Sequence, residues 1–327
     1  MILKREDLER ELRKEPTLRG SALKKRLKAY LSDAGARSRD IDKEMTLDAL
    51  CNLLELRGLE HSAGFYHYTS WSSFCKMILG TKDVKPYQLL LKSACKMNDA
   101  DDKHCGRDVY FTSFSYGEDE NLAMWQIYGK PKEETIRIRF PQSKILSWFI
   151  GRSAKKPEVH FSDVGYYCRR NGEDKAPVVY YRSKKVKIDE FGWFDSIRDG
   201  DPKRILFKRS GWLYEKEMRL SARSQDQRTD KGLAIDFRRP LEAVLADPLE
   251  NITFGPWFDR DEARKALSKI LVSNPKADPA TIEKLEEMLN ITVIDSVYRG
   301  TVRSLCDECE YRCEYKSTCE KKVRKTK

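Results

Sequence analysis

The sequence has no long apolar run. Its 327 residues are 40% hydrophobic and 35% charged, and apolar stretches such as Leu89 to Leu91 are short. A membrane-spanning helix needs ~20 apolar residues in a row. The N-terminus becomes charged at Lys4 without the apolar segment of a signal peptide. The sequence therefore predicts a cytoplasmic protein that makes no membrane contact.

Glycine-rich phosphate loops and internal repeats are also missing. Neither G-x-G-x-x-G nor the P-loop pattern occurs, so the common nucleotide-binding folds lack their signature. The hydrophobic share is large enough for a core, which excludes wholesale disorder. At this length we expect one sizeable domain with appendages, or two domains.

Cysteine is sparse until the last 22 residues, where four of the nine gather as C-x2-C-x3-C-x5-C: Cys306, Cys309, Cys313 and Cys319. An odd total excludes complete disulfide pairing, and in a reducing compartment such a cluster is more often a metal site. Four thiolates suit tetrahedral Zn²⁺ with sulfur at about 2.3 Å. A [4Fe-4S] cluster takes the same ligands, and unliganded thiols in a frayed tail are the remaining alternative.

Positive charge exceeds negative charge, with 63 Lys and Arg against 52 Asp and Glu. The net charge of +11 makes polyanionic partners plausible. Both ends of the chain are basic, and Leu23, Leu27 and Leu31 give the N-terminal part a helical apolar stripe. We expect a basic helical module at residues 1–60, a catalytic domain at 61–298 and a metal-binding tail at 299–327. The basic N-terminal module fits nucleic-acid binding, or simply a solvated face.

In the middle region, short strand-like runs are interleaved with helical patterns, which predicts an α+β domain. Its expected strands are Phe65 to Thr69, Val109 to Ser115, Thr135 to Phe140, Val178 to Tyr181, Met218 to Ala222, Ala243 to Ala246 and Ile291 to Val297. Its expected helices are Trp71 to Leu79, Glu120 to Tyr128, Ile197 to Phe207, Arg260 to Leu271 and Pro279 to Leu289.

Three segments carry candidate chemistry: one around His67, a hydroxyl-rich strand at 109–115, and Trp212 to Arg219. In a strand, Glu215, Glu217 and Arg219 would share one face. Two buried carboxylates need a cationic partner, and Arg219 is the nearest. The alternatives are an exposed edge strand with surface charge, and a core histidine at His67.

The order of these segments resembles the ADP-ribosyltransferase superfamily in its His-Tyr-Glu type, and distantly the DarT-type toxins and RNA 2′-phosphotransferases. Residues 65–300 also resemble a widespread bacterial family of unknown function. That second pattern is Met97-Asn98-Asp99, Met124-Trp125, Lys208, Trp212, Glu215, Glu217, Arg219, Phe254 to Pro256, Ser296 and Arg299. Ala100 stands where that family usually has Pro.

The first resemblance implies a split β-sheet core with flanking helices, NAD⁺ as substrate, and a role for each matched residue. Glu217 would stabilise the oxocarbenium-like transition state, and Glu215 would face and activate the acceptor. The other implied contacts are His67 with a ribose or the nicotinamide amide, Tyr110 or Tyr68 stacked on nicotinamide, Thr69 and Ser113 as orienting hydroxyls, and Arg219 with the NAD phosphates. Trp125 and Asn98 would be framework.

We therefore expect an NAD-dependent mono-ADP-ribosyltransferase that modifies RNA or single-stranded DNA. By analogy it would be a toxin or anti-phage defence effector with a neutralising antitoxin. Transfer to protein, NAD⁺ hydrolysis, and a non-catalytic zinc-containing nucleic-acid-binding protein are the alternatives.

Overall fold

The structure is a computed structural model. It describes residues 44–45, 50–51, 54–55, 64–97, 102–106, 108–128, 134–152, 157–168, 178–181, 184–188, 202–224, 232–291 and 295–299. Most of the predicted N-terminal module, Asn98 and Asp99, and the four tail cysteines lie outside these residues. In the described part, no helix is both long and apolar enough to span a bilayer.

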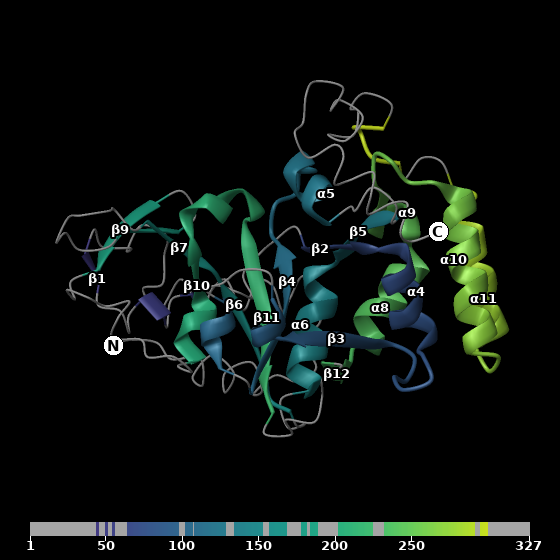
Figure 1. Ribbon diagram of the computed structural model, residues 1–327, viewed down its shortest axis with the longest axis horizontal. Coiled ribbons are helices and arrows are strands. Elements are labelled where there is room, and N and C mark those ends of the chain that lie inside the picture. Colours follow the sequence, from purple (N-terminus) through teal and green to yellow (C-terminus); the bar gives the residue numbers. More distant parts are fainter. Residues whose placement is uncertain are drawn as a thin grey trace, which may run out of the picture.

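The main sheet joins eight strands, and all of its strand pairs are antiparallel. Its path is β12-β3-β4-β2-β5-β13, while β11 pairs with both β4 and β6 (Figure 1). The strands are β2 Phe65–Ser70, β3 Gln88–Ser93, β4 Val109–Ser115, β5 Thr135–Phe140, β6 Val159–Asp163, β11 Glu217–Arg223, β12 Leu233–Asp236 and β13 Ile252–Phe254. Between β2 and β4 the register has one pair, Tyr66 with Ser115, so the sheet divides there.

A smaller five-stranded sheet lies beside the main one, in the order β1-β9-β8-β7-β10. Its strands are β1 Glu44–Met45, β7 Gly165–Cys168, β8 Val178–Tyr181, β9 Lys184–Ile188 and β10 Phe207–Arg209. Strand β10 runs parallel to β7 and carries Lys208 opposite Tyr166. It thereby delivers a lysine to the boundary between the two sheets.

Helices cover the main sheet. They are α4 Trp71–Leu79, α5 Leu122–Tyr128, α6 Gln142–Arg152, α8 Arg238–Ala246, α9 Pro248–Asn251, α10 Arg260–Ser273 and α11 Pro279–Met288. Residues 50–51 and 54–55 are also helical. Four short 3-10 helices are η1 Ala94–Lys96, η2 Asp102–Cys105, η3 Pro202–Leu206 and η4 Ser210–Glu215. Helices α10 and α11 lie side by side at one edge, where both contact α4 (Figure 1).

Helix α4 shows how local sequence sets these bounds. The Ser70 side chain accepts a hydrogen bond from the Ser73 N–H and caps the start. The helix ends before Gly80, whose φ is +78° and whose Cβ, if present, would lie 2.6 Å from the Val84 carbonyl oxygen. Only glycine accommodates that turn without strain.

The predicted α+β class is confirmed, and most predicted elements are present at nearly the predicted bounds. The predicted strand at Ala243 to Ala246 is wrong, because these residues end α8. Leu241, Val244 and Leu245 are buried at spacings of three and four, which is helical. Of the predicted strand Ile291 to Val297, the described residues show a single parallel bridge from Asp295 to Phe254.

Aromatic side chains fill the larger core on one face of the main sheet. Phe65 stacks on Phe161 at 5.6 Å between ring centroids, and Phe114 contacts both rings. A second core cluster lies between the sheets and buries Leu50 and Leu54. The candidate site lies where β11 begins, between these two cores.

Candidate functional site

A left-handed turn places two carboxylates side by side. Helix η4 ends at Glu215, Lys216 takes φ 45° and ψ 53°, and β11 begins at Glu217. The predicted strand through Glu215, Glu217 and Arg219 is therefore wrong at its first residue. Glu215 nevertheless meets Glu217, because the turn brings both side chains to the same lysine.

The register of β11 on β4 fixes which face Glu217 occupies. Glu217 lies opposite Ser115 and Arg219 lies opposite Ser113, so these four side chains share one face of the sheet. Ser113 Oγ donates to Glu217 Oε1 at 2.5 Å, and Arg219 Nε donates to the same oxygen at 2.7 Å. The Tyr166 hydroxyl accepts the Glu217 N–H at 2.7 Å. Both the side chain and the main chain of Glu217 are thus held.

Lys208 joins the two glutamates. Its Nζ lies 2.5 Å from Glu215 Oε2 and 3.1 Å from Glu217 Oε2. Arg219 Nη1 extends the chain of contacts to Asp102 Oδ1 at 2.8 Å and to the Ile205 carbonyl at 2.9 Å. We call the five charged side chains the buried ion cluster: Asp102, Lys208, Glu215, Glu217 and Arg219. Each residue of the cluster is at most 6% exposed.

The two glutamates have opposite pKa shifts. Burial alone would raise the pKa of Glu217, but the charges of Arg219 and Lys208 and the hydrogen bonds from Arg219 and Ser113 lower it to about 2. The pKa of Glu215 rises to about 7, because burial and the charge of Glu217 outweigh the attraction of Lys208. Near neutral pH, Glu217 is therefore ionised, whereas Glu215 is partly protonated.

The net charge of the cluster follows the state of Glu215. With Glu215 ionised, three carboxylates face two cations and one negative charge remains in excess. With Glu215 protonated, the charges balance. Because the cluster is shielded from water, that excess charge acts over a short distance with little screening.

Tyr68 lies on the same face as the cluster. It lies two residues after Tyr66 on β2, so the two side chains share a face, and Tyr66 pairs with Ser115. Its ring makes an edge contact with Trp125 at 4.8 Å between centroids, within an aromatic group that includes Tyr128 and Tyr214. The Tyr128 hydroxyl in turn donates to Glu215 Oε1 at 3.5 Å. The aromatic group therefore reaches Glu215 through Tyr128.

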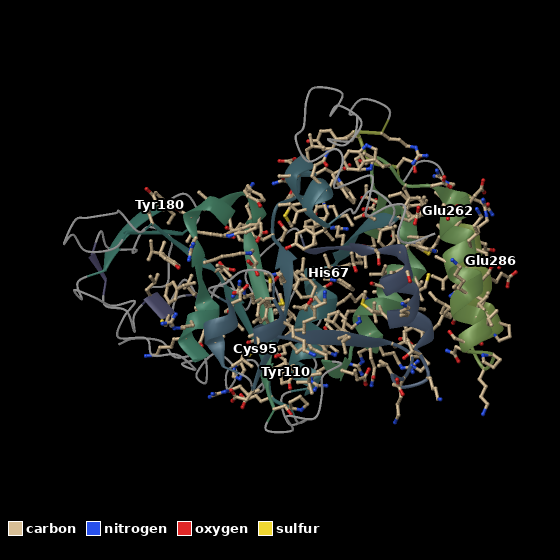
Figure 2. All side chains as sticks on the ribbon, viewed as in Figure 1. His67, Cys95, Tyr110, Tyr180, Glu262 and Glu286 are labelled. Atoms are coloured by element: carbon tan, nitrogen blue, oxygen red, sulfur yellow. The ribbon has the colours of Figure 1, made fainter. Side chains whose placement is uncertain are left out.

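His67 occupies the other face of the sheet. Its Nδ1–H donates to the Ser113 carbonyl at 2.9 Å, and its ring packs 5.5 Å from Phe114. Burial lowers its pKa to about 4, so the imidazole is neutral at pH 7. Figure 2 places it in the middle of the molecule. His67 and Glu217 thus contact Ser113 from opposite sides, with the strand between their side chains.

Two other predicted site residues also face away from the cluster. Thr69 alternates with Tyr68 and shares the face of His67. Tyr110 lies on β4 on the face opposite Ser113, is 2% exposed, and packs in the larger core. Figure 2 shows Tyr110 well separated from His67. Of the two tyrosines that the resemblance offers for nicotinamide stacking, only Tyr68 shares a face of the sheet with Glu217.

The remaining motif residues form a framework at the end of the domain. Trp125 Nε1 donates to Glu120 Oε2 at 2.9 Å, and the Ser296 hydroxyl donates to the same oxygen. Arg299 Nη1 donates to the Phe258 carbonyl at 2.9 Å. These contacts agree with a structural role for Trp125.

Sequence reasoning missed Asp102, Tyr128 and Tyr166. Asp102 lies on η2 and Tyr166 on the smaller sheet, so neither residue has a local pattern that links it to Glu217. Lys208 stood in the sequence motif without an assigned role. Its neighbours in the chain gave no sign that it bridges two carboxylates.

Comparisons with protein-family models, curated proteins and solved structures found no match to this chain. The resemblance to ADP-ribosyltransferases therefore stays a prediction. Among the residues that the structure describes, no group of three or more His, Cys, Asp or Glu is placed to hold a metal ion. The predicted four-cysteine site lies outside those residues.

Proposed function

We propose that the chain is an NAD-dependent mono-ADP-ribosyltransferase whose reaction takes place beside the buried ion cluster. The observation that carries this proposal is the pair of glutamates with separated pKa values, about 2 for Glu217 and about 7 for Glu215. Two neighbouring carboxylates in different protonation states can take different chemical roles.

The proposed reaction breaks one bond and forms another at C1′ of the nicotinamide ribose. The C1′–N bond breaks, its electrons leave with nicotinamide, and positive charge develops on the ribose. Ionised Glu217 and the excess negative charge of the cluster stabilise that charge. The acceptor atom then bonds to C1′, and its proton passes to ionised Glu215 as the general base.

Other residues on the same face support this chemistry. Tyr68 is the proposed stacking partner of nicotinamide, and Ser113 orients Glu217 through its hydroxyl. Arg219 differs from the role that the resemblance implies. Its donors are already used by Glu217, Asp102 and Ile205, and it is fully buried. We assign it to holding Glu217 rather than to binding phosphates.

Access of NAD⁺ to Glu217 requires that Lys208 move. Ser113 donates a hydrogen bond to Glu217 Oε1, whereas Lys208 Nζ donates one to the other oxygen, Oε2. Its long flexible side chain can leave that oxygen while keeping its contact with Glu215. The ribose hydroxyls then take the place of the lysine at Glu217 Oε2.

The proposed acceptor is RNA or single-stranded DNA, since the net charge is +11 and both ends of the chain are basic. A role as a toxin or anti-phage effector, held in check by an antitoxin, belongs to the same proposal. The Cys306, Cys309, Cys313 and Cys319 tail would hold one Zn²⁺. Metal analysis of the purified chain tests the tail, with about one zinc per chain expected and iron with sulfide contradicting it.

A second candidate is a non-catalytic nucleic-acid-binding protein with a zinc tail. The observation that favours it is the burial of Glu217, which is 2% exposed and whose oxygens are shared among Ser113, Arg219 and Lys208. In that case the ion cluster only joins the two sheets.

Labelled NAD⁺ separates these functions. We expect radioactivity from ³²P-labelled NAD⁺ to enter a pool of RNA or single-stranded DNA, with release of nicotinamide. Label on protein alone would change the acceptor class, and nicotinamide released with no labelled polymer would mean hydrolysis. Neither label transfer nor nicotinamide release, in any pool, would leave the non-catalytic candidate.

A further inference from the structure

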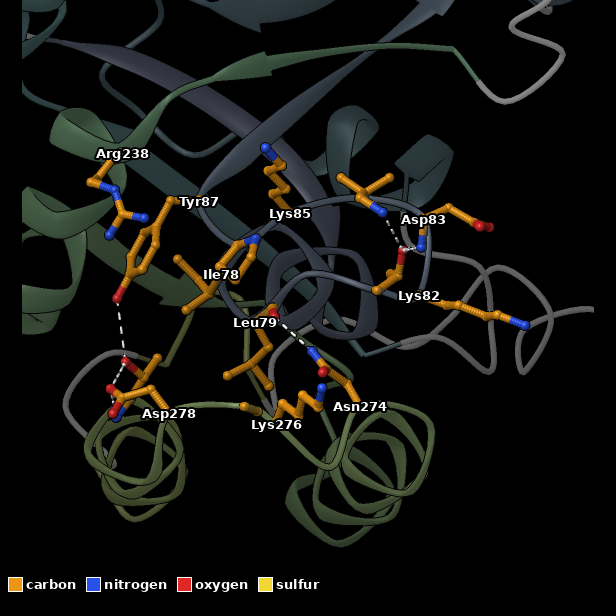
Figure 3. A pocket seen from close by; sticks show the side chains of 15 residues that line it. Ile78, Leu79, Lys82, Asp83, Lys85, Tyr87, Arg238, Asn274, Lys276 and Asp278 are labelled. Atoms are coloured by element: carbon orange, nitrogen blue, oxygen red, sulfur yellow. Dashed lines mark hydrogen bonds between the residues drawn. The ribbon is translucent and has the colours of Figure 1, made fainter.

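We propose that a cavity beside α10 and α11 is a binding site for a nucleoside phosphate. The cavity has a volume of about 700 Å³ and lies between the turn at 81–87 and the junction of the two helices (Figure 3). Small-molecule sites typically have volumes of several hundred Å³. Its walls come from α4, α8 and α11, the turn at 81–87 and the loop between α10 and α11. None of these contributes to the buried ion cluster, so this inference goes beyond the proposed transferase site.

Positive charge predominates in the lining. Four basic and two acidic residues line the cavity: Lys82, Lys85, Arg238, Lys276, Asp83 and Asp278. Lys85 and Lys276 have no ion-pair partner among the residues that the structure describes. Asp278 is occupied as the cap of α11, where its Oδ2 accepts from the Thr281 hydroxyl at 2.6 Å and from its N–H at 3.0 Å. Lys85 and Lys276 are therefore available to a ligand, whereas Asp278 is engaged at the start of α11.

Tyr87 gives one wall of the cavity a fixed shape. Its φ is +59°, a left-handed conformation that a tyrosine rarely adopts. Its N–H donates to the Ile78 carbonyl at 3.3 Å, its carbonyl accepts the Phe237 N–H at 2.9 Å, and its hydroxyl lies 3.3 Å from Thr281 Oγ1. Residues held in such conformations cluster at ligand sites.

The Tyr87 ring also positions a guanidinium. The Arg238 guanidinium carbon lies 4.3 Å from the ring centroid, and Nη1 makes a surface pair with Glu242 at 3.5 Å. Figure 3 shows the Arg238 side chain lying against the tyrosine at the rim of the cavity. A guanidinium fixed in this way presents paired donors to phosphate oxygens.

The rest of the lining suits an uncharged part of a ligand. Val84, Pro86 and Ala277 supply apolar surface, and the buried Ile78 and Leu79 lie behind it. Asn274 Nδ2 donates to the Leu79 carbonyl at 2.8 Å, which leaves its Oδ1 to accept from a ligand. A phosphate alone would fill a small part of this volume, whereas a nucleoside phosphate fills it and uses both kinds of surface.

The test measures binding to the full-length chain by calorimetry, with ATP as one probe and a ten-nucleotide single-stranded DNA as the other. The test variant is Lys85→Ala with Lys276→Ala. The matched control is Lys76→Ala with Lys269→Ala, which removes two exposed lysines of α4 and α10 that do not line the cavity. Because the measurement is of binding, it does not depend on NAD⁺ turnover.

We expect the test variant to weaken at least one probe about tenfold or more, while the control changes both by less than about twofold. If the test variant binds both probes more weakly, the site accepts a free nucleotide. If it binds only the oligonucleotide more weakly, the site accepts a nucleotide within a strand. Equal weakening by test and control variants would overturn the inference, as would the absence of saturable binding of either probe.

Discussion

The buried ion cluster and the surface of α10 contain ion pairs of nearly the same length. Lys208 and Glu215 are 2.5 Å apart in the cluster, and Lys265 and Glu262 are 2.6 Å apart on α10. Their burial differs, since the side chains of the first pair are 8% and 2% exposed and those of the second 64% and 55%. Exposed pairs contribute little, whereas breaking a buried pair leaves an uncompensated charge. Burial, rather than distance, therefore distinguishes the cluster as a candidate site.

Removing one cation from each region should give the largest difference in the free energy of unfolding. Arg219→Met leaves Glu217 and Asp102 without their guanidinium, so we expect the free energy of unfolding to fall by about 3 to 5 kcal/mol. Arg264→Met on α10, where Arg264 pairs with Asp261 at 2.8 Å, should change it by less than about 1 kcal/mol. Urea unfolding of the two variants checks this, and equal effects would remove the distinction between the regions.

Glu215 should affect the pH dependence of stability in a way that a surface carboxylate does not. The folded chain keeps the proton of Glu215 up to about pH 7, while the unfolded chain releases it near its ordinary pKa of 4.5. Glu215 therefore lowers stability as pH rises between these values, and Glu215→Gln removes that loss. The stability of the variant relative to wild type should grow by on the order of 3 kcal/mol between about pH 4 and pH 8.

Titration of His67 contributes equally to wild type and to Glu215→Gln, so it cancels in the difference between their free energies of unfolding. Unfolding curves at several pH values give the result directly. A difference that stays constant with pH would mean that Lys208 keeps Glu215 ionised throughout. Glu262→Gln on α10 serves as the surface control, because Glu262 is exposed.

Loss of a single hydroxyl should have a smaller effect. Tyr166→Phe keeps the packing but leaves the buried Glu217 N–H without its acceptor, and we expect a loss of about 1 to 3 kcal/mol. Tyr180→Phe on β8, in a partly exposed position, should be nearly neutral. If urea unfolding shows both variants to be neutral, the main chain of Glu217 does not depend on Tyr166.

Local pattern predicted the strands and helices well where one face of the element is apolar. Phe65 to Thr69, Val109 to Ser115 and Thr135 to Phe140 all lie in the main sheet. The error at Ala243 to Ala246 came from reading a short apolar run by itself, without the spacing from Leu241 that marks a helix. Short runs of this kind fit strand and helix equally.

The candidate site was predictable only in part. The sequence pointed to Glu217 and to a cation beside it, and Arg219 fills that role. The expectation that His67 and Glu217 would meet in one NAD⁺ crevice is wrong, because the pairing of β2 with β4 and of β11 with β4 puts their side chains on opposite faces of the sheet. Lys208 stood in the family pattern without a role, and nothing in the sequence indicated Asp102 or Tyr166, since Asp102 contacts Arg219 from η2 and Tyr166 contacts Glu217 from the smaller sheet. Tertiary contacts between distant segments leave no local pattern.

The most direct test of the proposed chemistry compares nicotinamide release from NAD⁺ by the wild-type chain, Glu217→Gln and the exposed-site control Glu286→Gln, with RNA and single-stranded DNA present. The account predicts release by wild type and Glu286→Gln, and at least about a hundredfold loss in Glu217→Gln, the size typical of removing one electrostatic contact from a transition state. Melting curves confirm that Glu217→Gln is folded. Undiminished release by the folded Glu217→Gln variant, or no release by the wild-type chain, would contradict the account.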